Sequence, residues 1–60
     1  MRLYVGPMDA YVVEVGADGR VKLDSEDWST PTLQERRAII YAAENELAEL
    51  RELVQILESS

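Results

Sequence analysis

The sequence predicts an α+β fold in which a three-stranded antiparallel β-meander precedes one long C-terminal helix. Two observations carry this prediction. In VVEVGADGRVKL, residues 12–23, apolar and polar side chains alternate on both sides of a glycine-containing turn, as in a β-hairpin. From Leu33 to Glu58 the chain is rich in Ala, Leu, Glu and Arg without a break, and these residues favour helix.

The chain has 60 residues, which is enough for a single domain and only a small core. We expect three parts within that domain. Residues 1–24 form the antiparallel sheet, residues 25–31 an acidic connector, and residues 32–58 a long amphipathic helix. A core this small usually needs support from disulfides, a metal or another chain.

The alternation on both sides of Ala17-Asp18-Gly19 selects a three-residue hairpin loop, with Gly19 at positive φ. This loop gives the cross-strand pairs Val15–Val21, Glu14–Lys22 and Val13–Leu23. One face of the hairpin is then apolar, and the other carries a pair of opposite charges.

RLYV, residues 2–5, supplies the remaining strand, with residues 6–10 as the connection and Pro7 presetting its turn. We expect Leu3 opposite Val13, and Val5 opposite Tyr11. The inner face would comprise Leu3, Val5, Tyr11, Val13, Val15, Val21 and Leu23. The outer face would carry a row of Arg2, Glu14 and Lys22, with Tyr4 beside Val12.

The helix has two possible start signals. Thr30 before Pro31 fits an N-cap followed by a first helical residue. Thr32 with Glu35 fits a capping box. Both lie within the usual uncertainty of a helix boundary.

The helix is too long and too apolar for the sheet alone. About 26 residues span roughly 39 Å, whereas a compact globule of this size is only about 27 Å across. An apolar seam follows the 3-4 spacing of paired helices: Ile40, Ala43, Leu47, Leu50, Val54 and Leu57. Ile39, Ala42, Leu53 and Ile56 widen it to an arc of roughly 200°, about twice what one buried side requires.

We therefore expect a coiled-coil-like contact with a second copy of the chain, mainly through the C-terminal half of the helix. The predicted oligomer interface comprises Ile40, Ala43, Leu47, Leu50, Leu53, Val54 and Leu57. A homodimer is the expected state and a higher oligomer the alternative, with the helices parallel or antiparallel. Two charges lie within the arc, Arg36 and Glu46. Each either reaches water from an edge or forms a cross-chain Arg36–Glu46 pair.

Composition excludes several functions. With no cysteine and no histidine, the chain lacks disulfides, thiolate metal sites and the commonest general base. Its net charge of −6 is spread evenly, with no basic stripe for nucleic acid. No apolar run reaches the roughly 20 residues of a membrane span. We expect a cytoplasmic protein that binds neither membrane nor nucleic acid directly.

The chemistry of the side chains does not favour an enzyme. No imidazole is available to activate the hydroxyl groups of Ser or Thr. The acidic stretch DSED, residues 24–27, has oxygen ligands suited to weak Ca²⁺ or Mg²⁺ binding. It lacks the EF-hand loop pattern, however, and an acidic connector is also favourable before a helix N-terminus. We therefore assign no catalytic, cofactor-binding or metal-ligating residue.

Two features are candidates for binding another protein. The only Trp, Trp28, either closes one end of the core or anchors a partner. The polar side of the helix is either a solvated face or a docking face for a basic protein. The candidate partner-binding residues are Trp28, Glu44, Glu49 and Glu52.

These observations favour a small acidic, non-enzymatic regulatory or inhibitory protein. It would act as a homo-oligomer that binds and blocks a larger protein, as antitoxins, phage-encoded inhibitors and nucleic-acid mimics do. Two alternatives are a self-assembling scaffold module whose main partner is itself and a designed mini-protein. The sequence does not identify the partner.

Overall fold

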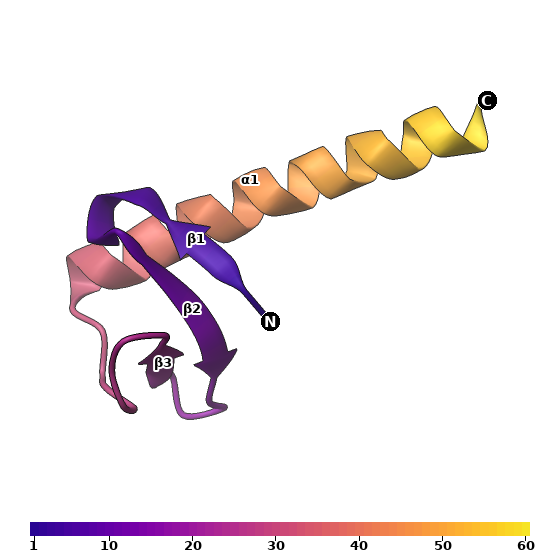
Figure 1. Cartoon of the computed structure of the whole chain (residues 1–60). Helices are drawn as coiled ribbons and strands as arrows, with labels where there is room; N and C mark the ends of the chain where they lie inside the picture. The colour runs from indigo at the N-terminus through magenta and orange to yellow at the C-terminus, as the bar shows by residue number, and fades with distance from the viewer.

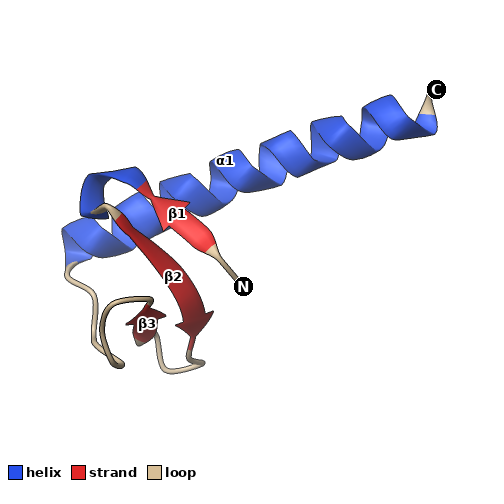
Figure 2. Cartoon of the chain, viewed as in Figure 1, coloured by secondary structure: helices blue, strands red, loops and turns tan.

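The computed structural model describes all residues from Met1 to Ser60. In chain order the elements are β1 (Leu3–Val5), the 3₁₀ helix η1 (Gly6–Met8), β2 (Ala10–Val15), β3 (Val21–Leu23) and α1 (Leu33–Glu58). The strands form one antiparallel sheet in the order β1-β2-β3. Figures 1 and 2 show this sheet beside the first turns of the helix. The predicted α+β class and the β-meander are confirmed.

The helix extends far beyond the sheet (Figure 1). It has 26 residues, and the molecule measures 42 × 21 × 18 Å along its principal axes. The long dimension is close to the length expected of the helix itself. No helix of the chain combines the length and apolarity needed to cross a membrane.

The core lies between the sheet and the first three turns of α1. Four apolar residues of the sheet are buried: Val5, Val12, Val21 and Leu23. From the helix only Ala38, Ile39 and Ala42 pack against them. Small side chains at two of these three helical positions allow the helix to approach the sheet closely. Beyond Ala42 every helical residue is exposed.

The predicted hairpin loop is confirmed. Gly19 has φ +90°, a conformation that L side chains rarely adopt. The loop is closed by a hydrogen bond of 2.8 Å from Gly16 N to Arg20 O. The pairs Glu14–Lys22 and Val15–Val21 form as predicted. Val15 is nevertheless 52% exposed, because it lies at the open end of the sheet rather than in the core.

The register of β1 with β2 was predicted incorrectly by one residue. The observed pairs are Leu3–Val12, Tyr4–Tyr11 and Val5–Ala10, in place of Leu3–Val13 and Val5–Tyr11. The connection is shorter than expected, because η1 and a single left-handed residue, Asp9 (φ 48°, ψ 48°), complete the reversal. Since a shift of one residue exchanges the two faces of a strand, Val12 is buried, whereas Tyr11 and Val13 are not part of the core.

An irregularity in β2 reconciles this register with the hairpin. Val12 pairs with Leu23, and Glu14 pairs with Lys22, so that Val13 is an extra residue between them. This arrangement has the form of a β-bulge. The predicted pair Val13–Leu23 is therefore wrong, although the hairpin loop itself was predicted correctly.

The outer face of the sheet carries a small aromatic cluster. The rings of Tyr4 and Tyr11 lie 5.1 Å apart, and the Arg2 guanidinium lies 4.1 Å from the centroid of the Tyr11 ring. The Tyr4 hydroxyl donates to Oδ1 of Asp9 at 2.7 Å. This hydrogen bond, together with the negative charge of Asp9, raises the pKa of Tyr4. Tyr11, rather than Val12, is thus the neighbour of Tyr4.

The connector folds back on β3 before the helix begins. Val21 and Ser29 exchange two backbone hydrogen bonds of 2.9 Å. Of the two possible helix starts, the capping box is the one that forms. Glu35 N donates to Oγ1 of Thr32 at 3.1 Å, and Thr32 N donates to Oε1 of Glu35 at 2.8 Å.

Candidate functional site

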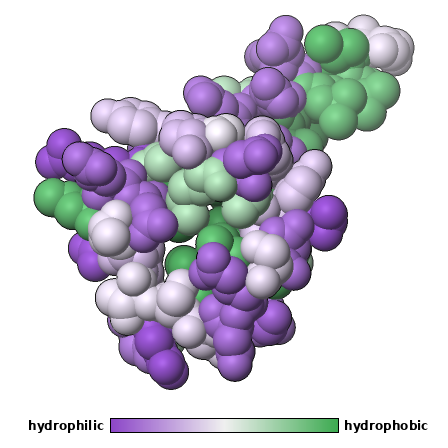
Figure 3. All heavy atoms as spheres, turned by 60° about the vertical axis from the view of Figure 1, so that its left-hand side comes forward, coloured by the Kyte–Doolittle hydropathy of each residue, from purple (hydrophilic) through white to green (hydrophobic).

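The main candidate site is the exposed apolar side of the second half of α1. Its large apolar side chains are 49–65% exposed, and Figure 3 shows hydrophobic atoms gathered over the far part of the helix. These residues are Leu47, Leu50, Leu53, Val54, Ile56 and Leu57. Isolated large apolar side chains are ordinary on a surface, but a contiguous row of this kind marks an interaction site.

The structure places the predicted interface residues on one continuous surface of the helix. Ile40 is 47% exposed and Ala43 is also exposed, so the seam is accessible from the second turn of α1 to its end. The sheet occupies a neighbouring side of the helix, through Ala38, Ile39 and Ala42. The apolar arc is therefore divided between the sheet, in the first turns, and a long uncovered stripe.

A groove runs beside the middle of this stripe. It has a volume of about 310 Å³ and lies between the start of the chain and the helix. The wall residues are Met1, Arg2, Leu3, Ala43, Glu46, Leu47 and Leu50. Sequence reasoning missed the contribution of residues 1–3. The sequence does predict a first strand packed on the helix. Such a strand must bring residues 1–3 close to one side of the seam.

The two charges predicted within the apolar arc are both exposed. Arg36 lies one turn before Ile40, and Glu46 forms part of the groove wall. No ion pair joins them within the chain, whose single salt bridge is Arg20–Asp18 at 2.9 Å. This exposure agrees with side chains that reach water from the edge of the seam. The cross-chain pair is a property of an oligomer and stays a prediction.

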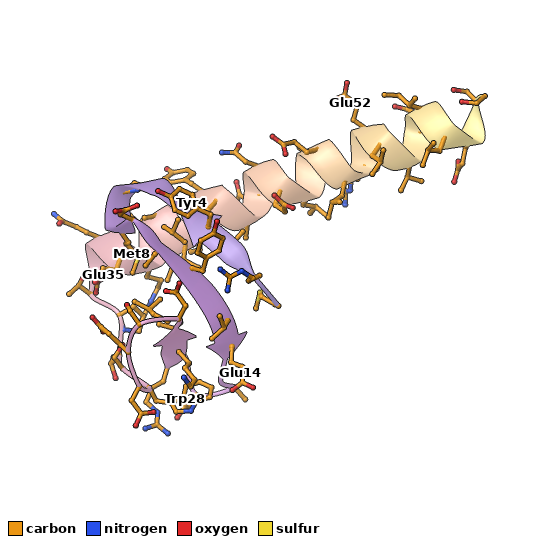
Figure 4. The ribbon with its side chains drawn as sticks, in the orientation of Figure 1. Tyr4, Met8, Glu14, Trp28, Glu35 and Glu52 are labelled. Atoms are coloured by element: carbon orange, nitrogen blue, oxygen red, sulfur yellow. The ribbon has the colours of Figure 1, made fainter.

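Three acidic residues of the helix lie outside the seam. Glu44, Glu49 and Glu52 are all exposed, and none of them forms a salt bridge within the chain. In Figure 4, Glu52 points away from the side of the helix where the sheet lies. These carboxylates are therefore available to a partner without disturbing the core.

Trp28 lies far from those glutamates, at the hairpin end of the molecule (Figure 4). Its ring lies against Gly16, directly before the hairpin loop. A methyl group at Gly16 would be 3.5 Å from Cζ3 of Trp28. The residue is 39% exposed. Trp28 thus covers the end of the hairpin, and the structure does not join it with Glu44, Glu49 and Glu52 into one site.

A second groove, of about 320 Å³, lies between η1 and the connector. Three carboxylates line it, those of Asp9, Glu26 and Glu35. Glu35 is already engaged by the capping box through the hydrogen bond from Thr32 N. Neither in this groove nor in the DSED stretch do three acidic side chains come close enough together to hold a metal ion.

The comparisons with known proteins give no relative: no family model, no curated protein and no solved structure matches this chain.

Proposed function

We propose that this chain is a non-enzymatic binding protein that functions as a homodimer. The observation that supports this proposal is the row of half-exposed Leu, Ile and Val side chains along the second half of α1. Their 3-4 spacing matches a second helix rather than a sheet, because it gives the repeat of helices that pair side by side. A second copy offers the same seam, and self-complementary contacts are the usual basis of two-fold dimers.

The stability of the helix itself supports the same proposal. Residues 43–58 are all exposed in the single chain, so the sheet contributes little to their helical structure. In proteins most of the stability of a helix comes from tertiary packing of its apolar face rather than from local propensity. A partner helix on the seam would supply the tertiary contacts that the sheet does not give.

The test is analytical ultracentrifugation of the chain over a wide concentration range. A dimer at tens of micromolar, dissociating on dilution, is the expected result. A monomer throughout that range would refute the proposed homodimer. Circular dichroism at each concentration adds a second reading, because helix content should rise as the dimer forms.

For the role of the dimer, we propose regulation or inhibition of a larger protein with a basic surface. The free carboxylates of Glu49 and Glu52 favour this role over scaffolding by self-assembly alone. A surface with one sign of charge attracts a partner of the opposite sign and speeds encounter.

Affinity purification followed by mass spectrometry tests this role. A basic protein should be captured by the wild type and lost with Glu49→Gln/Glu52→Gln, which leaves the seam intact. Gln55→Asn changes a nearby polar residue without changing its charge and serves as the control. Recovery of the chain alone would contradict the regulatory role and leave self-assembly as the function.

A further inference from the structure

We infer that the two helices of the proposed dimer run antiparallel, with Leu47 of each chain beside Leu50 of the other. This inference rests on the proposed homodimer and specifies its geometry. In the seven-residue repeat, Ile40, Leu47 and Val54 occupy position a, and Ala43, Leu50 and Leu57 occupy position d. Antiparallel helices place an a residue of one chain beside a d residue of the other.

The flanking charges are complementary in this arrangement. Position e carries Arg37, Glu44, Arg51 and Glu58, and antiparallel helices bring e beside e. With Leu47 next to Leu50 of the partner subunit, Glu44 lies beside Arg51 of the partner subunit. In the same register Arg37 lies beside Glu58 of the partner subunit. Two-fold symmetry repeats both contacts, so every charge at position e faces an opposite charge.

The ends of the helices favour the same orientation. Arg36 precedes Ile40 on the seam and is exposed, and in the antiparallel register it lies just beyond Leu57 of the partner subunit. The C-terminal end of a helix has a partial negative charge that attracts cations. The helix of the partner ends at Glu58, which adds a carboxylate close to Arg36 and Arg37.

A parallel pair would lose these contacts and introduce a repulsive one. Each Arg36 would meet its own copy within the apolar seam, and like charges in such a position disfavour the wrong pairing. One attractive contact would form instead, between Glu46 and Arg51 of the partner subunit. A parallel pair thus has one attractive type of contact and a like-charge pair on the seam.

Side-chain volumes also favour the antiparallel pair. It places small Ala43 beside Val54 of the partner subunit, and Ile40 beside Leu57 of the partner subunit. Parallel helices would place Ala43 next to its own copy and leave a gap in that layer. Matching small with large residues across an interface fills such layers evenly.

The sheet leaves room for the partner. It contacts Ala38, Ile39 and Ala42, whereas Arg36, Ile40 and Ala43 stay exposed. The end of the partner helix can therefore lie along the seam to its beginning. The groove of about 310 Å³ beside Ala43 and Glu46 then receives Leu53 of the partner subunit. In this register Arg36 and Glu46 are too far apart along the pair to form a cross-chain contact.

Cross-linking distinguishes the two orientations, because the chain contains no cysteine. Ala43→Cys and Val54→Cys are prepared separately, and each is treated with a short bismaleimide cross-linker alone and after mixing. An antiparallel pair gives covalent dimer only in the mixture. A parallel pair gives covalent dimer with each variant alone, which would overturn the inference. Asn45→Cys, on the outward side of the helix, is the control and should give little product.

Sedimentation of the wild type and the same variants without the cross-linker distinguishes the existence of the homodimer from the orientation of its helices. Monomeric wild type would refute the homodimer itself. A wild-type dimer whose Cys variants also dimerise, but react alone or fail to react in the mixture, would refute only the orientation and register.

Exchanging the charges of Arg51 and its predicted partner tests the orientation of the helices independently, through the affinity of the dimer. Arg51→Glu should weaken dimerisation several-fold, because it places like charges at both symmetric contacts. Adding Glu44→Arg should restore the affinity if the helices are antiparallel, whereas restoration by Glu46→Arg instead would show that they are parallel. Failure of both exchanges to restore the affinity would refute the proposed contact of Arg51.

Discussion

Leu50→Glu provides the most direct test of the exposed seam. Leu50 lies in the middle of the seam and is 49% exposed in the single chain, so a partner helix would cover roughly half of its surface. Full burial of a Leu side chain contributes about 1.5–3 kcal/mol. Burial of the exposed half of Leu50 by the partner helix would therefore stabilise the dimer by about 1 kcal/mol per copy, or about 2 kcal/mol in total.

The introduced carboxylate adds to that loss. In the antiparallel register it would lie against Leu47 of the partner subunit, and burial of an unpaired charge among apolar groups is strongly unfavourable. A total loss of about 3 kcal/mol or more raises the dissociation constant at least roughly a hundredfold, since each 1.4 kcal/mol is about tenfold. Helical circular dichroism should fall with the dimer, because residues 43–58 are all exposed in the single chain.

Sedimentation and circular dichroism at matched concentrations are the assay. Gln55→Glu is the control, because it adds the same charge on the polar side of the helix and should retain the dimer. If Leu50 were simply surface, its replacement would cost under about 1 kcal/mol, as surface substitutions usually do. A Leu50→Glu variant that keeps both the mass and the helicity of the wild type would show that Leu50 lies outside the interface.

Three further predictions concern the sheet and the cap. Gly19→Val should lower the melting temperature, with a cost of about 1–2 kcal/mol or more, since a β-branched side chain is strained at φ +90°; an unchanged melting temperature would contradict the loop. Thr32→Ala should cost about 1 kcal/mol in a denaturant titration by removing the cap on Glu35 N, whereas Thr32→Ser should retain most of the stability. Asp9→Asn should lower the pKa of Tyr4, read by absorbance of the tyrosinate, because it removes the negative charge of Asp9; an unchanged pKa would show that Asp9 does not set it.

The hairpin and the helix could be predicted because each depends on local information. Gly19 and the alternation around it specify the loop, and the helix-forming run after Thr32 specifies a helix that ends at Glu58. The register of β2 could not be predicted in this way. It depends on Asp9 adopting a left-handed conformation and on Val13 being an extra residue, and both were hidden by a pattern in which Val12 and Val13 are equally apolar.

The division of the apolar arc was also beyond local reasoning. The sequence indicates that the helix is apolar on more than one side, but not which side the sheet takes. The structure assigns Ala38, Ile39 and Ala42 to the sheet, and thereby identifies the uncovered side as the one that begins with Ile40 and Ala43. The groove formed with Met1 and Leu3 follows from the path of β1 and has no pattern of its own in the sequence.

The size of the core explains why the seam matters for folding as well as for binding. The sheet buries four apolar side chains, and a chain this short has little other means of support. Beyond Ala42 the helix meanwhile carries six large apolar residues that its own sheet does not cover. If two copies pair, contacts of those residues stabilise only the folded chain, so that association and folding become linked by mass action. A substitution on the seam should then reduce the stability of the folded chain as a whole. A substitution of Glu52, on the opposite face of the helix, should leave that stability unchanged.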